Sequence, residues 1–185
     1  MEITFLVLLI YASLLLVYDY EVAPDLRTGL QRRLTVLLVR QVRLSVEYRD
    51  MNARRDLQLL HESIRAVDSN LHLITLGSLL CVGAESTEDP VFLERAQQRA
   101  RTLDESTVPG IREVYAEIVE IATKAAIING VSRMALFAAP WVLASIGLDA
   151  VKKRIRVLTV LSDDDFQRVA PRSRVSRSFR RLLRR

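Results

Sequence analysis

The chain has 185 residues, of which 50% are hydrophobic, 6% aromatic and 26% charged, with a formal net charge of +5 and a mean hydropathy of +0.15. With 6 Gly, 5 Pro and a single Cys, the composition excludes a collagen-like chain, a disordered tail protein and a disulfide scaffold. A mean hydropathy this high beside so many charges requires apolar and charged residues to be segregated along the chain.

The first apolar segment, residues 3–18, contains 16 residues without a charge, between Glu2 and Asp19. A span needs about 20 residues, and nearby tyrosines at headgroup level extend this one, so we predict a transmembrane helix over 3–20. A secretory signal peptide is the alternative. Because no Lys or Arg precedes the run and no small-x-small cleavage site follows it closely, we expect the segment to be retained.

Two further apolar segments follow. Residues 71–84 have a length that fits either a buried core helix or a span, and they are interpreted as a second transmembrane helix over 69–84. The third, over 125–150, is interrupted by Arg133 and Pro140 and is rich in small residues, which permit close helix packing in lipid.

The distribution of charge favours three crossings of the cell membrane. Nine Arg lie in 19–68, five basic residues against nine acids lie in 85–124, and twelve basic residues against four acids follow Leu148. Since basic segments near spans stay cytoplasmic, this pattern predicts an external N-terminus, cytoplasmic 19–68, external 85–124 and a cytoplasmic C-terminus. The alternatives are one or two spans with 71–84 folded against protein, or a soluble helical core that contains all three segments.

Residues 25–70 are predicted to form a cytoplasmic helical hairpin. Two apolar stripes with spacings of three and four residues run through this region, and their phase changes at 50–53. A half-buried strand over 41–48 is the alternative for part of the first stripe, but no strand of similar quality lies nearby to pair with it. The residues expected to pack helix against helix are Leu30, Leu34, Leu37, Leu57, Leu60, Ile64 and Val67.

The segment 85–124 is predicted to be helical. Asp89 is a good N-cap and Pro90 suits the first helical turn, so a helix is expected to run to about Glu105. The sequence TVPG at 107–110 then breaks the chain. Apolar residues at spacings of three and four predict a second helix that continues into the third span.

The tail, 151–185, is strongly basic. Ser162 with three following Asp predicts a helix start, and Pro171 ends that helix. The last fourteen residues hold seven Arg and no acid, with apolar residues on one helical face, which predicts an amphipathic helix docked on anionic lipid of the inner leaflet. Binding of nucleic-acid phosphate and a solvated tail that only fixes orientation are the alternatives. The arginines concerned are Arg172, Arg174, Arg177, Arg180, Arg181, Arg184 and Arg185.

No motif for catalysis, cofactor binding or metal binding is present. His61 and His72 are eleven residues apart, or about 16 Å along one helix, too far to share a metal. His72 is expected at the membrane interface and Cys81 in a core. Arg133 is a candidate intramembrane charge that would need a partner, although an arginine there can also snorkel and mark the start of the span.

Together these features predict an all-α integral membrane protein of three spans. It is expected to be a non-enzymatic scaffold or accessory subunit without a small-molecule substrate or cofactor. The heptad stripes exceed what a three-span monomer can bury, so homo- or hetero-oligomers with other membrane helices are expected. One alternative is a homo-oligomeric channel or pore, whose topology alone is similar to that of some phage holins. The other is a membrane tether that binds nucleic acid through the tail.

Overall fold

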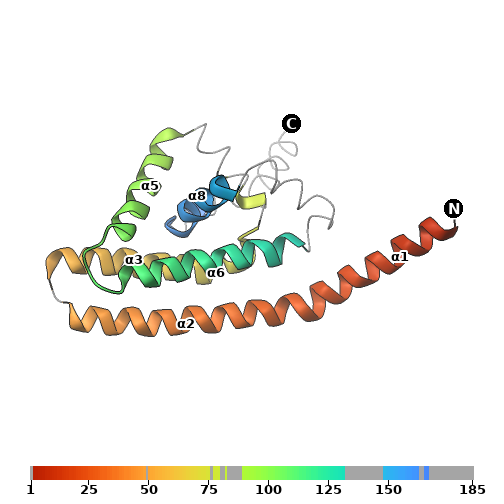
Figure 1. The fold of residues 1–185 in the computed structure, drawn as a ribbon, viewed down its shortest axis with the longest axis horizontal. Coiled ribbons are helices and arrows are strands. Elements are labelled where there is room, and N and C mark those ends of the chain that lie inside the picture. Colours follow the sequence, from red (N-terminus) through yellow and green to blue (C-terminus); the bar gives the residue numbers. More distant parts are fainter. Residues whose placement is uncertain are drawn as a thin grey trace, which may run out of the picture.

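The computed structural model describes residues 2–48, 50–75, 77–79, 82, 89–131, 148–162 and 165–166 (Figure 1). Within these ranges every regular element is helical and none is a strand, which confirms the all-α prediction and excludes the strand over 41–48. The helices are α1 (Glu2–Val17), η1 (Tyr18–Val22, a π-helix), α2 (Ala23–Glu47), α3 (Met51–Asn70), η2 (Leu71–Leu73, a 3₁₀-helix), α5 (Pro90–Asp104), α6 (Ile111–Val131) and α8 (Leu148–Thr159).

The first three elements form one unbroken helical rod. Figure 1 shows α1 projecting beyond the other described helices, while α2 lies along them. The rod passes through Pro24, whose ring would meet the carbonyl four residues earlier in a regular helix. The π-helical turn before it, in which the Ala23 amide donates to the Tyr18 carbonyl, widens the backbone at this point. The proline therefore marks the boundary between the apolar part of the rod and α2.

Helices α2 and α3 form an antiparallel hairpin. The chain turns between Glu47, the end of α2, and Met51, the start of α3, close to the predicted phase change at 50–53, and it is extended at Tyr48 and Asp50. Gln41, which continues the spacing of Leu34 and Leu37 along α2, is buried, and its amide donates to the Leu57 carbonyl over 3.3 Å. Its amide oxygen lies 3.2 Å from Nδ1 of His61. The polar side chain thus joins the two helices instead of opening the interface.

A second pair of helices follows. The carboxylate of Asp89 accepts from the Phe92 amide over 3.1 Å, which confirms the predicted cap of α5. The turn between α5 and α6 contains Gly110 at a φ of 90°, a conformation that side chains rarely adopt. A Cβ at this glycine would lie 3.4 Å from the Leu44 side chain, so the turn packs closely on α2.

The body has three layers. Helices α3 and α6 lie in the middle, α2 packs against both, and α5 and α8 cover the opposite side (Figure 1). One continuous apolar core runs through these layers. Its largest fully buried side chains are Tyr115, Phe166, Leu34, Leu37, Leu60, Ile64, Leu71, Ile74, Leu79, Leu103, Ile111 and Ile118.

Candidate functional site

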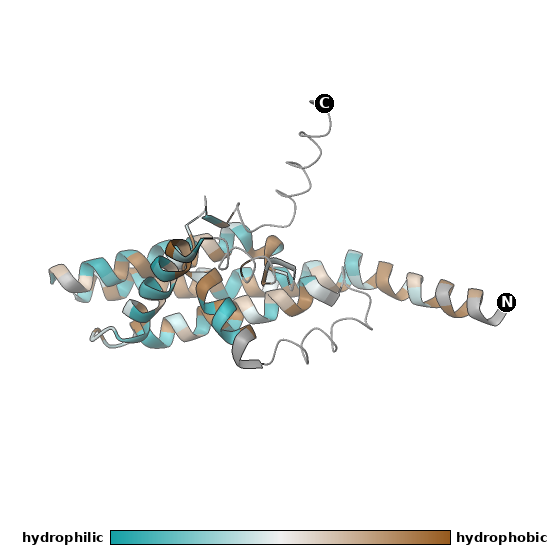
Figure 2. Cartoon of the chain, turned by 90° about the horizontal axis from the view of Figure 1, so that it is seen from above, coloured by the Kyte–Doolittle hydropathy of each residue, from teal (hydrophilic) through white to brown (hydrophobic). Residues whose placement is uncertain are grey.

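The apolar part of the rod is exposed. Phe5 and Leu14 keep 69% and 63% of their surface accessible, and neighbouring apolar side chains of α1 are similarly exposed. Among the described residues, one helix, Phe5–Glu47, is long and apolar enough to cross a membrane, and none of its most apolar stretch is buried. Figure 2 shows brown and pale residues along the end of the rod nearest the N-terminus, whereas teal is frequent over the body. A signal sequence at an N-terminus has the same length and composition.

A polar junction holds the base of this rod against α6. The Tyr18 hydroxyl donates to the Ile128 carbonyl over 3.2 Å, and Nε of Arg27 donates to Oδ1 of Asn129 over 2.7 Å. Nδ2 of Asn129 donates to the Leu71 and Ile74 carbonyls, each over 2.8 Å. One buried amide therefore joins α6 both to α2 and to the segment after α3. Asn129 was not predicted from the sequence, where its only signal is a polar side chain inside an apolar run.

The described part of the predicted second span lies in the protein core. Helix α3 ends at Asn70, at the start of the predicted second span, and a 3₁₀ turn and an extended residue, Ile74, follow. The Asn129 side chain satisfies two of the carbonyls that this break exposes, as buried carbonyls require. The buried apolar side chains of this segment are Leu71, Leu73, Ile74, Leu79 and Val82.

Contacts between flanking helices do not support the second and third predicted spans as single crossings. Helices α3 and α5, on either side of residues 71–88, contact each other, and so do α6 and α8, on either side of 132–147. A single crossing would separate each pair by a hydrocarbon layer of about 30 Å. The prediction that 85–124 is external while 25–70 is cytoplasmic is unsupported for the same reason, since α2 packs on α6.

Ion pairs also connect the two segments that the sequence analysis assigned to opposite faces. Nη1 of Arg33 lies 3.5 Å from Oε1 of Glu120, and Nη1 of Arg40 lies 3.4 Å from Oε1 of Glu117. The hydrogen bond from Lys124 lowers the pKa of Glu120. Pairs this exposed contribute little to stability, because water and salt screen them. Their effect is to align α2 with α6, since Arg33 and Arg40 of α2 are paired to acids of α6.

The predicted helix-packing residues lie together in one core. Since the chain buries them within its own body, they no longer require a partner helix. The start of the predicted cytoplasmic tail also enters this core, because α8 buries Val151 and Ile155 against α5 and α6. Arg133, the predicted intramembrane charge, and the tail arginines from Arg172 onward lie outside the described residues. The helix-packing residues are Leu30, Leu34, Leu37, Leu57, Leu60, Ile64 and Val67.

Tyr115 connects α6 to α8. Its ring is buried and its hydroxyl donates to the Arg156 carbonyl over 3.4 Å. Burial raises the pKa of Tyr115 to about 12, because the phenolate loses its hydration there. A buried tyrosine that stays protonated and donates to a backbone carbonyl serves a structural role. Nη1 of Arg156 in turn lies 3.2 Å from Oδ2 of Asp104, so α8 is also paired to the end of α5.

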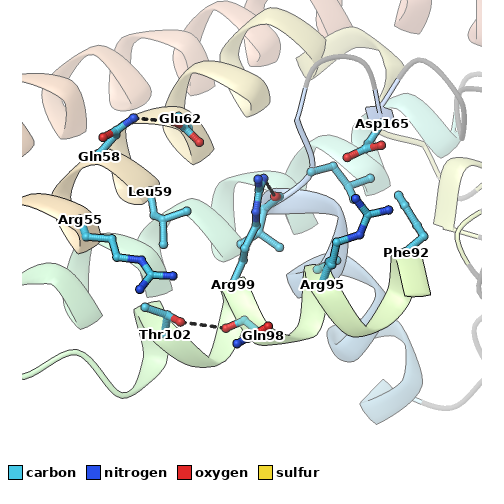
Figure 3. A pocket seen from close by; sticks show the side chains of 13 residues that line it. Arg55, Gln58, Leu59, Glu62, Phe92, Arg95, Gln98, Arg99, Thr102 and Asp165 are labelled. Atoms are coloured by element: carbon cyan, nitrogen blue, oxygen red, sulfur yellow. Dashed lines mark hydrogen bonds between the residues drawn. The ribbon is translucent and has the colours of Figure 1, made fainter. Parts of the chain in front are cut away.

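A cavity of about 380 Å³ lies between α3, α5 and the end of α8 (Figure 3). Arg55 reaches it from α3, and Arg95 and Arg99 from successive turns of α5. Glu62 and Asp165 lie at its edges. The remaining lining is polar at Gln58, Gln98 and Thr102 and apolar at Leu59, Phe92, Ala96, Val160 and Leu161.

The described residues include no group of three or more His, Cys, Asp or Glu side chains that could hold a metal ion. His61 is occupied with Gln41, as described above. Comparison of the chain with protein-family models, with curated proteins and with solved structures finds no match.

Proposed function

We propose that this protein is a membrane-anchored scaffold or accessory subunit: the helix over 3–20 crosses the bilayer once and holds a helical body at the cytoplasmic face. The observation that carries the proposal is the exposed apolar stretch of α1, which continues without a break into α2. A helix with this much apolar surface outside the protein core gains free energy from lipid contact.

Charge supports the cytoplasmic location of the body. Four Arg lie within the 20 residues after the proposed span, at 27, 32, 33 and 40, against two acids, and a juxtamembrane excess of Arg and Lys keeps a segment in the cytoplasm. The seven arginines of 172–185 would then face anionic lipid of the same leaflet, each contributing up to about 1 kcal/mol of attraction near the surface. The anchor and the basic tail would together hold the body at the membrane.

The body fits a structural role better than a catalytic one. Its buried amide side chains, such as those of Asn129 and Gln41, donate hydrogen bonds to backbone carbonyls. The neutral hydroxyl of Tyr115 donates to another backbone carbonyl. A scaffold needs this kind of rigid, satisfied core, and we expect no enzymatic activity. Three crossings remain the competing topology, in which 71–84 and 125–150 would also contact lipid.

The proposal is tested on the full chain in its native membrane. After an alkaline carbonate wash, the protein should stay in the pellet with its uncut mass of 21.0 kDa. A shorter product that lacks α1 would identify a signal sequence, and release of the uncut chain would identify a peripheral protein. Either result contradicts the anchor.

A flux measurement distinguishes the scaffold from a pore. Liposomes that contain the purified chain should pass no more ions than empty liposomes do, because the proposed single span has no ionisable side chain between Ile3 and Tyr18 except tyrosines. A salt-sensitive conductance that Arg133→Ala abolishes would replace the scaffold with a channel.

A further inference from the structure

The cavity between α3 and α5 collects positive charge. Three guanidinium groups from two helices border one space, and none is within ion-pair distance of a carboxylate among the described residues. Elsewhere in the body, Arg33, Arg40 and Arg156 do have such partners.

Most hydrogen-bond donors of these groups are unused by the described residues. Arg55 makes no hydrogen bond to them, Arg95 donates from Nε to the Val91 carbonyl over 3.4 Å, and Arg99 donates from Nη1 to the Val160 carbonyl over 3.4 Å. A guanidinium carries five N–H donors in a planar fork. The cavity therefore offers a set of donors that a single multivalent anion could satisfy.

The two carboxylates at the edges leave the guanidinium groups in excess. Glu62 accepts from Nε2 of Gln58 over 3.1 Å, and Asp165 accepts from the Ser162 hydroxyl over 2.9 Å. With three cations against two anions, the cavity has a net charge of +1. This balance selects against cations and favours a compact anion near α5.

We infer that this cavity binds a phosphate monoester of a small molecule with an apolar part. Arginine forks pair bidentately with phosphate oxygens, so Arg95 and Arg99, one turn apart on α5, suit such a group, and Arg55 adds a cation to the lining from α3. The buried side chains of Phe92 and Leu161 supply an apolar wall beside the charges. The volume lies in the range of small-molecule sites. Phosphate binding itself does not depend on the anchor, whereas the choice of a soluble phosphate over a lipid headgroup rests on the proposed anchor.

The position of the cavity favours a soluble phosphate over a lipid headgroup. Gln41 contacts Leu57 beside the cavity, and it lies about 19 residues beyond the end of η1, or roughly 28 Å along a helix that rises 1.5 Å per residue. If the apolar stretch of the rod occupies the bilayer, headgroups end well short of Arg55 and Arg99.

The test measures binding of phenyl phosphate to the full chain in nanodiscs of neutral lipid by calorimetry. We expect saturable binding that Arg55→Gln and Arg99→Gln each weaken roughly ten- to a hundredfold, the range for losing a charge-assisted hydrogen bond. Arg101→Gln is the matched control, since this exposed arginine of α5 does not line the cavity, and it should change the affinity less than about twofold. Phenol, which lacks the phosphate, should not bind.

Two results overturn the inference: no saturable binding to the wild type, or an equal loss of affinity in all three variants. Because Arg99 bonds to the Val160 carbonyl, its variant could lose structure, whereas Arg55 has no such bond and keeps the test valid. Nanodiscs with phosphatidic acid form a second arm. Unchanged phenyl phosphate affinity in these nanodiscs supports a soluble ligand. A loss of affinity caused by competition from the lipid would instead identify a lipid headgroup as the ligand.

Discussion

Deleting residues 2–17, which leaves Tyr18 and its hydrogen bond to α6 in place, should move the protein from the carbonate-washed membrane pellet to the soluble fraction while its body stays helical. The segment has eleven Leu, Ile, Phe and Val residues between Ile3 and Tyr18, and at about 0.3 to 0.6 kcal/mol each they favour insertion by roughly 5 kcal/mol. The most apolar stretch contributes nothing to the core, so its loss leaves the packing of α2 intact. Circular dichroism of the soluble product measures the remaining helix.

A pair of substitutions checks the same point without shortening the chain. Leu9→Arg with Leu14→Arg should release the protein, because two central arginines cost about 5 to 7 kcal/mol and cancel the gain from insertion. Val39→Arg with Val46→Arg is the matched control, since these valines are equally exposed but lie on α2 outside the span. Equal partitioning of the two double variants would contradict a membrane role for α1.

Asn129→Ala should lower the free energy of unfolding by about 3 kcal/mol, since each buried polar group left unpaired costs about 1 to 3 kcal/mol. The substitution leaves the Leu71 and Ile74 carbonyls without this donor and removes the acceptor of Arg27. Urea unfolding of the full chain in mild detergent, followed by circular dichroism, measures the change.

Two further variants separate the contributions at this junction. Asn129→Asp keeps the acceptor for Arg27 but removes both donors and brings negative charge next to the Leu71 and Ile74 carbonyls, so it should destabilise at least as much as the alanine. Gln31→Ala, on the exposed face of α2, should stay within about 0.5 kcal/mol of the wild type. An alanine effect at Asn129 as small as this control would mean that the junction does not stabilise the body.

Local patterns in the sequence predicted most of the helices. The spacing of Leu30, Leu34 and Leu37 identifies the buried face of α2, and Asp89 with Pro90 identifies the start of α5. Such signals are local, since three- and four-residue spacings and caps act within one helix.

Beyond the hairpin of 25–70, the contacts between helices could not be predicted from the same patterns. The length of the 14-residue apolar run at 71–84 is compatible with either lipid or a protein core around it. Only the tertiary structure shows that the Ile74 carbonyl accepts a hydrogen bond from Asn129. The cavity likewise depends on tertiary structure, because Arg55 and Arg99 line it from two helices that are far apart in sequence. The structure does not support the location inferred from the acids of 85–124, because acids of α6 in that segment pair with arginines of α2.

The side of the membrane on which α3 and α5 lie is the most direct test of the proposed architecture. In a chain that carries Cys81→Ser, single cysteines introduced by Glu2→Cys, Asp50→Cys and Glu94→Cys would be treated with a membrane-impermeant maleimide in right-side-out and inverted vesicles. We predict that positions 50 and 94 react only in inverted vesicles and position 2 only in right-side-out vesicles. Labelling of positions 50 and 94 from opposite sides would contradict the single span and favour three crossings.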